Sequence, residues 1–123
     1  TLAASVDFLV VCASGGADTR ALVNADVLAA LGPSGVLVNI ARGSIVDEDA
    51  LITALRERQI LAAGLDVFCH EPHVPPALLA LDNVVLTPHM ASTTGATVQA
   101  MFDLTFANLA AHFDGLPVPT PVA

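Results

Sequence analysis

Short apolar runs alternate with amphipathic stretches along most of the chain. Four runs rich in aliphatic and β-branched residues predict strands at 7–12, 36–40, 64–68 and 83–86. Within each run, apolar residues follow one another instead of alternating with polar ones, which is typical of strands with both faces covered. The pattern therefore predicts a parallel sheet packed between helices.

Helical patterns fill the gaps between the strands, at 24–31 and 47–58. In the second helix, acidic residues occupy the first turn and Arg56 and Arg58 the last, which suits the helix dipole at both ends. The segment 71–82 holds three prolines and predicts an irregular connection with a single helical turn.

A long helix is predicted after the last strand. Ser92, Thr93 and Thr94 can cap its start, and Asp114-Gly115 with the prolines that follow ends it near Phe113. The chain thus divides into alternating strands and helices and then one long helix with a tail.

Composition narrows the class of protein. A chain of 123 residues with 54% hydrophobic content suits one heavily buried α/β domain. Its longest apolar runs reach about half a dozen residues, against the roughly 18 that a membrane span needs. The net charge of -8 disfavours nucleic acid and anionic membrane surfaces as partners.

Cellular location is indicated by the cysteines and the first residues. Cys12 and Cys69 are too few for a disulfide framework and have no C-x-x-C spacing. Residues 1–7 lack the features of a secretory signal. We therefore expect a cytoplasmic protein.

Chemically useful side chains follow three of the predicted strands. Arg42 comes after the second, Asp66 and Glu71 after the third, and His89 after the fourth. Because the carboxyl ends of parallel strands meet at one edge, these residues should converge in one cleft. A permanent cation, two carboxylates and an imidazole meet the needs of 2-keto acid reduction: a carboxylate anchor, a proton donor and a partner for that donor.

Three motifs resemble the signatures of the D-2-hydroxyacid dehydrogenase family. They are residues 38–48 (VNIARGSIVDE), residues 63–68 with Glu71-Pro72 (AGLDVF, EP), and residues 86–89 (LTPH). The match extends from Phe8 to about Pro119, and the order and spacing are like those of the family.

The resemblance implies a fold. It is an α/β fold, a partial Rossmann-like, doubly wound parallel sheet that forms the C-terminal half of a dinucleotide-binding domain, plus a C-terminal helix. Residues 1–92 would belong to that domain, and 93–123 would form a helix and tail that pack on a substrate domain outside this chain. No G-x-G-x-x-G follows a strand, so the phosphate-binding half of the dinucleotide site is not in these residues.

The resemblance also implies catalytic roles. Arg42 would bind the substrate carboxylate and polarise the keto oxygen, while His89 donates a proton as hydride arrives from the nicotinamide. Glu71 would hydrogen-bond His89 so that a proton is available near neutral pH.

The cofactor implied is NAD or NADP. Asp66 and the backbone of Ile40, Ala41 and Arg42 would meet the nicotinamide carboxamide, with His89 beside them. Ser14, where the family often has Pro, would lie near the adenosine side. The loop 12–16 departs from the commoner histidine-containing form, and the departure bears on the adenosine side alone.

Each of these residues has a simpler interpretation. Arg42 could pair with Asp47 on the surface, His89 could cap a strand end, and Asp66 could bond backbone amides. The segment 69–73 (CHEPH) resembles a small metal cluster, but it lacks a second ligand pair and a helical i, i+4 geometry. We therefore predict no metal.

Three hypotheses about function remain open. The first is an NAD(P)H-dependent reductase that converts a small 2-keto acid to the D-2-hydroxy acid and forms a homodimer. Leu31-Gly32-Pro33 and 71–75 resemble the glyoxylate, hydroxypyruvate and hydroxyphenylpyruvate reductase branch. The second is a corepressor-like module that binds NAD(P) without turnover. The third is a chain that is inactive by itself.

Overall fold

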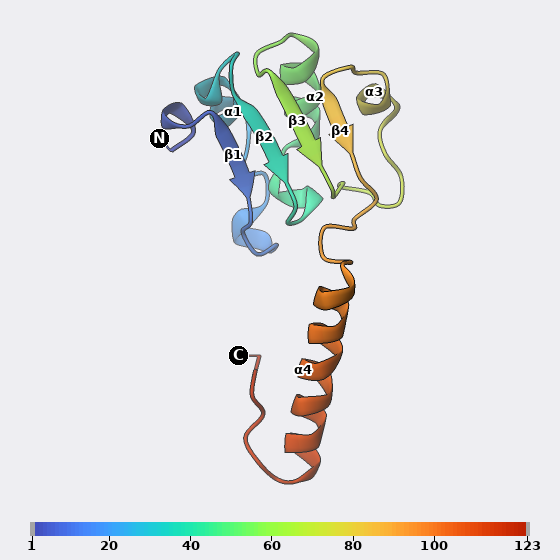
Figure 1. Cartoon of the computed structure of the whole chain (residues 1–123). Coiled ribbons are helices and arrows are strands. Elements are labelled where there is room, and N and C mark those ends of the chain that lie inside the picture. Colours follow the sequence, from blue (N-terminus) through green and yellow to red (C-terminus); the bar gives the residue numbers. More distant parts are fainter. Residues whose placement is uncertain (1, 123) are drawn as a thin grey trace. The chain divides into compact units, whose positions relative to one another are not determined.

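The computed structural model describes residues 2–122 and contains one parallel sheet with the strand order β1-β2-β3-β4 (Figure 1). The strands are β1 (Phe8–Val11), β2 (Val36–Asn39), β3 (Ala62–Leu65) and β4 (Val84–Leu86). The helices are α1 (Ala25–Leu31), α2 (Glu48–Arg56), α3 (Pro76–Leu79) and α4 (Gly95–Phe113). Short 3₁₀ turns are η1 (Leu2–Ser5), η2 (Ala17–Thr19) and η3 (Gly43–Ile45). The predicted parallel α/β fold is confirmed.

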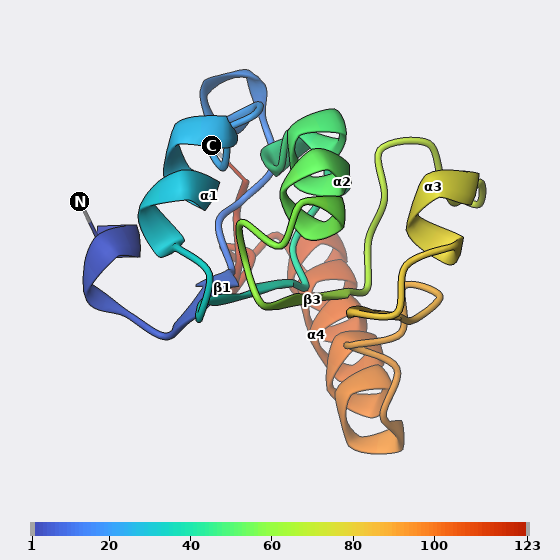
Figure 2. The ribbon, with the colours of Figure 1, turned by 90° about the horizontal axis from the view of Figure 1, so that it is seen from above.

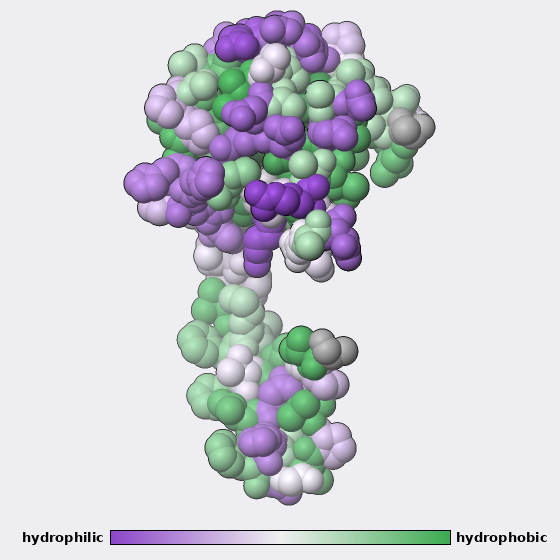
Figure 3. All heavy atoms as spheres, turned by 180° about the vertical axis from the view of Figure 1, so that it is seen from behind, coloured by the Kyte–Doolittle hydropathy of each residue, from purple (hydrophilic) through white to green (hydrophobic). Residues whose placement is uncertain are grey.

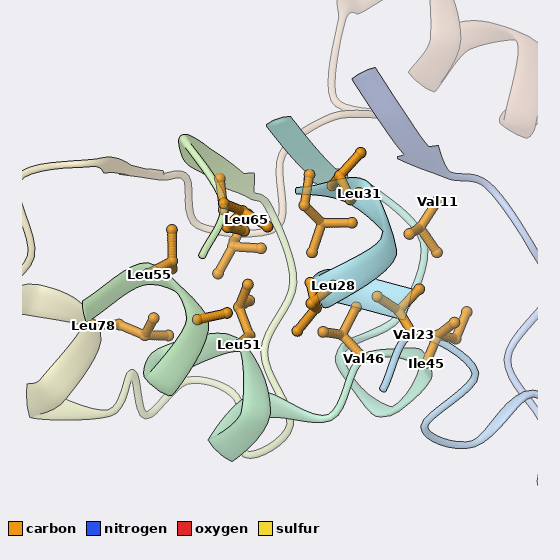
Figure 4. Close-up of a cluster of buried hydrophobic side chains, with 14 of the residues drawn as sticks. Val11, Val23, Leu28, Leu31, Ile45, Val46, Leu51, Leu55, Leu65 and Leu78 are labelled. Atoms are coloured by element: carbon orange, nitrogen blue, oxygen red, sulfur yellow. The ribbon is translucent and has the colours of Figure 1, made fainter. Parts of the chain in front are cut away.

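One face of the sheet carries the core. Leu65 of β3 lies in a buried cluster with Leu28 of α1 and Leu51 and Leu55 of α2 (Figure 4). Leu37 of β2 is buried in the same cluster. Figure 2 shows α1 and α2 on the same side of the strands. Successive right-handed crossovers that progress in one direction across a sheet leave their helices on one face, which explains this arrangement.

The opposite face of the sheet is apolar and open. Phe8 and Val10 on β1 and Val85 on β4 keep 65%, 51% and 68% of their surface exposed. The continuous apolar strands predict cover on both faces, but within the unit that ends at His89 the helices lie on one face only. The apolar pattern therefore predicts that residues outside this unit cover the opposite face in the complete protein.

Polar side chains fix the starts of the helices. Asn24 accepts the Val27 amide at 3.1 Å, and Asp47 accepts the Ala50 amide at 3.0 Å. Thr94 accepts the amide of Thr97 at 3.3 Å at the start of α4. These hydrogen bonds satisfy amides that have no partner within the helix.

The third strand differs from its prediction. It spans Ala62–Leu65, whereas the sequence pattern predicts 64–68. The Asp66 amide donates to the Asn39 carbonyl at 3.0 Å, which is the last hydrogen bond between β3 and β2. The Phe68 amide donates instead to the Glu71 carboxylate. The apolar residues after Leu65 thus form a buried loop beside the strand end.

Contacts divide the chain into two units, one ending at His89 and one beginning at Met90. In the second unit, none of the α4 residues is buried. Asn108 bonds both the hydroxyl and the amide of Thr120, at 2.9 and 3.1 Å, so the tail returns along its own helix. The visible surface of α4 is largely hydrophobic (Figure 3). Among residues 2–122, no helix has the length and apolarity that crossing a membrane requires.

Candidate active site

Asn39 fixes the loop that follows β2. Its side chain is 1% exposed, donates from Nδ2 to the Arg42 carbonyl at 3.0 Å and accepts the Ala41 amide on Oδ1 at 3.1 Å. A buried amide with both ends satisfied holds the intervening backbone in one conformation. The role of Asn39 is not predicted from the sequence, although a single amide at the end of an apolar strand is a signal for one.

Arg42 lies on this loop and is exposed. Its Nη1 donates to the Ala41 carbonyl at 2.6 Å. Its stem crosses Gly15, where a Cβ would come within 2.8 Å of the Arg42 Cγ. The alternative pairing of Arg42 with Asp47 does not form between these two described residues, because Asp47 caps α2.

A cleft of about 710 Å³ lies between the loops that follow β1 and β2. It is lined by Cys12, Ala13, Ser14, Gly15, Gly16, Ile40, Ala41, Arg42 and Ser44. The structure thus brings Ser14, Ile40, Ala41 and Arg42 together in one cleft at the carboxyl edge of the sheet.

Gly43 joins this loop to the one that follows β3. A Cβ at Gly43 would overlap the carbonyl of Phe68 and the amide nitrogen of Cys69. Only a residue without a side chain allows the two backbones to approach so closely. This contact places the Arg42 loop next to the Glu71 loop.

Glu71 and His89 form a pair. The carboxylate Oε2 lies 2.7 Å from the imidazole Nδ1, while Oε1 accepts the Phe68 amide at 3.0 Å. The hydrogen bond from His89, the one from Phe68 and the nearby charge of Arg42 hold the pKa of Glu71 below its usual value. His89 has a left-handed backbone with φ of 53°, a conformation that is often found at functional sites.

The hollow beside this pair has a volume of about 290 Å³. Its lining is mostly apolar and comprises Phe68, Glu71, Pro72, Val74, Leu79, Leu86, Thr87, Pro88 and His89. Glu71 and His89 therefore lie at the border between an apolar hollow and the carboxyl edge of the sheet.

Asp66 follows β3, the strand between β2 and β4. It is 4% exposed, and its Oδ1 accepts the hydroxyl of Thr87 at 2.5 Å. A buried carboxylate requires hydrogen-bond donors because it has lost its hydration. Asp66 thus lies in the row of strand ends that also carries Arg42 and His89.

A metal cluster is not formed in residues 2–122, where no group of three or more His, Cys, Asp or Glu side chains could hold an ion. In the segment 69–73, the Cys69 amide bonds Glu48 at 3.0 Å and Glu71 turns to His89. Burial raises the pKa of the Cys69 thiol, and the charge of Glu48 adds to this effect. The thiol is therefore poorly suited to metal ligation as a thiolate.

A parallel sheet with loops and polar groups gathered at its carboxyl edge defines an α/β domain of the dinucleotide-binding class. Residues 1–91 match the model of the NAD-binding domain of D-isomer-specific 2-hydroxyacid dehydrogenases. The chain therefore belongs to this family, whose members use NAD or NADP.

Known relatives agree with this assignment. Over 121 residues the chain is 50% identical to hydroxyphenylpyruvate reductase of Plectranthus scutellarioides and 51% identical to a glyoxylate/hydroxypyruvate reductase of Arabidopsis thaliana. Each alignment covers 98% of this chain and 39% of the relative.

The chain is also similar to reductases of known structure. The NADPH-dependent glyoxylate/hydroxypyruvate reductase of Sinorhizobium meliloti, in complex with NADP and malonate, superposes with a TM-score of 0.94 at 55% identity. The match covers 99% of this chain and 38% of that one. The chain thus spans about two fifths of the length of the relatives it matches.

Proposed function

We propose that the protein to which this chain belongs reduces a small 2-keto acid to the D-2-hydroxy acid with NADH or NADPH. The observation that carries the proposal is the bond of 2.7 Å between Glu71 and His89 at the sheet edge that also carries Arg42. The bond supports a proton donor with its carboxylate partner, and the charge of Arg42, which helps to lower the pKa of Glu71, supports a cation near this pair.

His89 is the proton donor in this proposal. Its Nδ1 faces Glu71, so Nε2, on the other side of the ring, is the nitrogen that would protonate the keto oxygen. The Glu71 carboxylate stabilises the imidazolium and fixes the ring. The lowered pKa of Glu71 agrees with this role, because its largest cause is the hydrogen bond with His89, which stabilises the carboxylate.

Arg42 binds the substrate carboxylate and polarises the keto oxygen. The guanidinium is a permanent cation with a fork of donors that matches a carboxylate. Its Nη1 bonds the Ala41 carbonyl, so the side chain must turn away from this carbonyl to engage a substrate with both nitrogens. The Asn39 hydrogen bonds keep the backbone of the loop in place during this turn.

The residues present fit a nicotinamide cofactor. A carboxamide offers N–H donors and a carbonyl acceptor, which suit the Asp66 carboxylate and the backbone of Ile40, Ala41 and Arg42. Ser14 lines the cleft between the loops after β1 and β2, which supports our assignment of Ser14 to the adenosine side. When bound, the cofactor supplies the hydride that reduces the keto carbon.

The proposal extends to substrate and assembly. Glyoxylate, hydroxypyruvate and hydroxyphenylpyruvate are the substrates we test first, because relatives at 50% and 51% identity are named for them. We assign residues 1–92 to the cofactor domain and 93–123 to a helix and tail that pack on a substrate domain. We further propose a cytoplasmic homodimer, for which the free Cys12 and Cys69 favour a reducing compartment.

The test uses the full-length protein. Oxidation of NADH and NADPH is followed with the three keto acids for wild type, Arg42→Ala and His89→Ala, with Arg56→Ala and His73→Ala as controls. We expect each active-site change to lower kcat/KM by about 10²-fold or more. The controls should stay close to wild type.

The corepressor-like alternative predicts a different result. In that case wild type binds NADH or NADPH but reduces none of the keto acids, and neither Arg42→Ala nor His89→Ala changes any rate. We expect no turnover from the isolated 123-residue chain under either hypothesis, because it has no G-x-G-x-x-G after a strand and covers 38% of the reductase of Sinorhizobium meliloti.

A further inference from the structure

Thr87 makes a hydrogen bond that the proposed mechanism does not use. Its hydroxyl lies 2.5 Å from Oδ1 of Asp66, and its own amide bonds the Leu65 carbonyl at 2.9 Å. The two residues come from the ends of adjacent strands, β3 and β4. The sheet register therefore holds donor and acceptor together.

The acceptor, Asp66, is a buried carboxylate. Asn39 and Asp66 are the buried residues with polar or charged side chains among those that the structure describes, and Asp66 is 4% exposed. A carboxylate without hydration is oriented by its hydrogen-bond donors, because each donor also supplies favourable charge. Thr87 is a stiff donor, because its branched Cβ restricts χ1.

We infer that Thr87 is a positioning residue for cofactor binding. By donating to Oδ1, it fixes the Asp66 carboxylate in the orientation that accepts the carboxamide N–H of a nicotinamide. The inference rests on the proposed function and adds a residue to it. Its effect should fall on the affinity for the cofactor, because Glu71 and His89 are left in contact with each other.

The same short segment also carries the proton donor. The His89 amide bonds the Thr87 carbonyl at 3.1 Å through the backbone. Replacing the Thr87 side chain leaves this backbone bond available. A change in cofactor affinity can therefore be separated from a change in proton transfer.

The experiment compares Thr87→Val, which keeps the shape and removes the donor, with Thr87→Ser, which keeps the donor. Thr105→Val serves as the control, because the Thr105 hydroxyl bonds the Met101 carbonyl on α4. Full-length proteins are titrated with NADH and NADPH, and the KM for the cofactor and kcat are measured for a 2-keto acid. Thermal unfolding of each variant is recorded as well.

We expect Thr87→Val to raise the Kd for the reduced cofactor about tenfold, the size of one hydrogen bond to a charged group, with a smaller change in kcat. Thr87→Ser should stay within about twofold of wild type, since it keeps the hydroxyl. Thr105→Val should match wild type.

A cofactor analogue distinguishes positioning from a purely structural role. The reduced 3-acetylpyridine analogue has a methyl ketone in place of the carboxamide and cannot donate to Asp66. Wild type should bind this analogue more weakly than NADH, and Thr87→Val should lose most of that preference. The inference would be overturned if Thr87→Val melted at a lower temperature but still preferred NADH over the analogue as strongly as wild type does.

Two further outcomes separate this inference from the proposed function. If wild type binds NADH or NADPH and Thr87→Val binds it with the same affinity, only the inference about Thr87 is overturned. Wild type that binds neither NADH nor NADPH overturns both the inference and the proposed function.

Discussion

The Glu71 carboxylate is held by two hydrogen-bond donors. They are the imidazole of His89 and the backbone amide of Phe68. Both favour the ionised form, so the carboxyl loses its proton at a lower pH than an ordinary glutamate. The contribution of Glu71 to the free energy of unfolding is therefore fully present at pH values above the pKa that Glu71 has in the unfolded chain. It is lost as the pH falls through the lowered pKa of the folded state.

A titration tests this dependence. In His89→Ala the pKa of Glu71 should rise toward its usual value, because the largest cause of the shift is removed while the Phe68 bond stays. The carboxyl carbon of Glu71, followed by NMR across the acidic range, reports the change. His73→Ala is the control, because it removes a histidine of the same loop; an equal rise there would contradict the assignment to His89.

Gly43 offers a prediction about stability. In Gly43→Ala the new methyl would overlap the backbone of Phe68, which cannot rotate away as a flexible side chain would. We expect a loss of about 1–3 kcal/mol in the free energy of unfolding, the range for overpacking. Urea denaturation of the full-length protein measures it.

Gly16→Ala is the matched control, because a Cβ there meets nothing within 4 Å and the backbone is extended at φ of 170°. Equal losses in the two variants would show that glycine flexibility matters at both positions. The contact between Gly43 and Phe68 would then not explain the effect of Gly43→Ala.

The site could be predicted from the sequence only in part. Arg42, Glu71 and His89 stand in motifs with recognisable spacing, and the structure brings Glu71 and His89 into contact. Asn39 and Thr87 were given no role, because their importance lies in hydrogen bonds across the turn and between strands. Sequence distance does not show which side chains face each other across such a sheet edge.

At the scale of elements, helix starts were the most predictable feature. Asn24, Asp47 and Thr94 are capping residue types at the places where helical patterns begin, and all three cap helices. The bounds of strands were less predictable, since the apolar Val67 and Phe68 suit a buried loop as well as a strand. Hydrophobicity alone does not distinguish the two.

The cap of α2 provides a prediction at this scale. Asp47→Ala removes the acceptor of the Ala50 amide and should lower the free energy of unfolding by about 1 kcal/mol. Asp47→Asn keeps an acceptor oxygen and should recover most of that loss. Chemical denaturation of the full-length protein measures both, and equal losses would mean that the charge near the helix start outweighs the hydrogen bond.

At the scale of the whole molecule, apolar surface is the dominant feature. The open sheet face exposes Phe8, Val10 and Val85, and α4 carries further exposed apolar residues: Met101, Phe102, Leu104, Phe106, Leu109 and Phe113. A helix that is apolar on every side is typical of one that is buried in its finished protein. Relatives more than twice as long as this chain contain additional residues that can cover such surfaces.

The isolated chain should therefore associate with itself. Exposed apolar patches of this kind drive association in water, and β1 also offers an edge without a strand partner in residues 2–122. Sedimentation velocity over a range of concentrations should show species that grow with concentration. A triple variant, Phe8→Thr, Val10→Thr and Val85→Thr, puts polar, β-branched residues on the strands and should shift the distribution toward monomer. A single monomeric species at all concentrations in wild type would show that the apolar surfaces are satisfied within the chain itself.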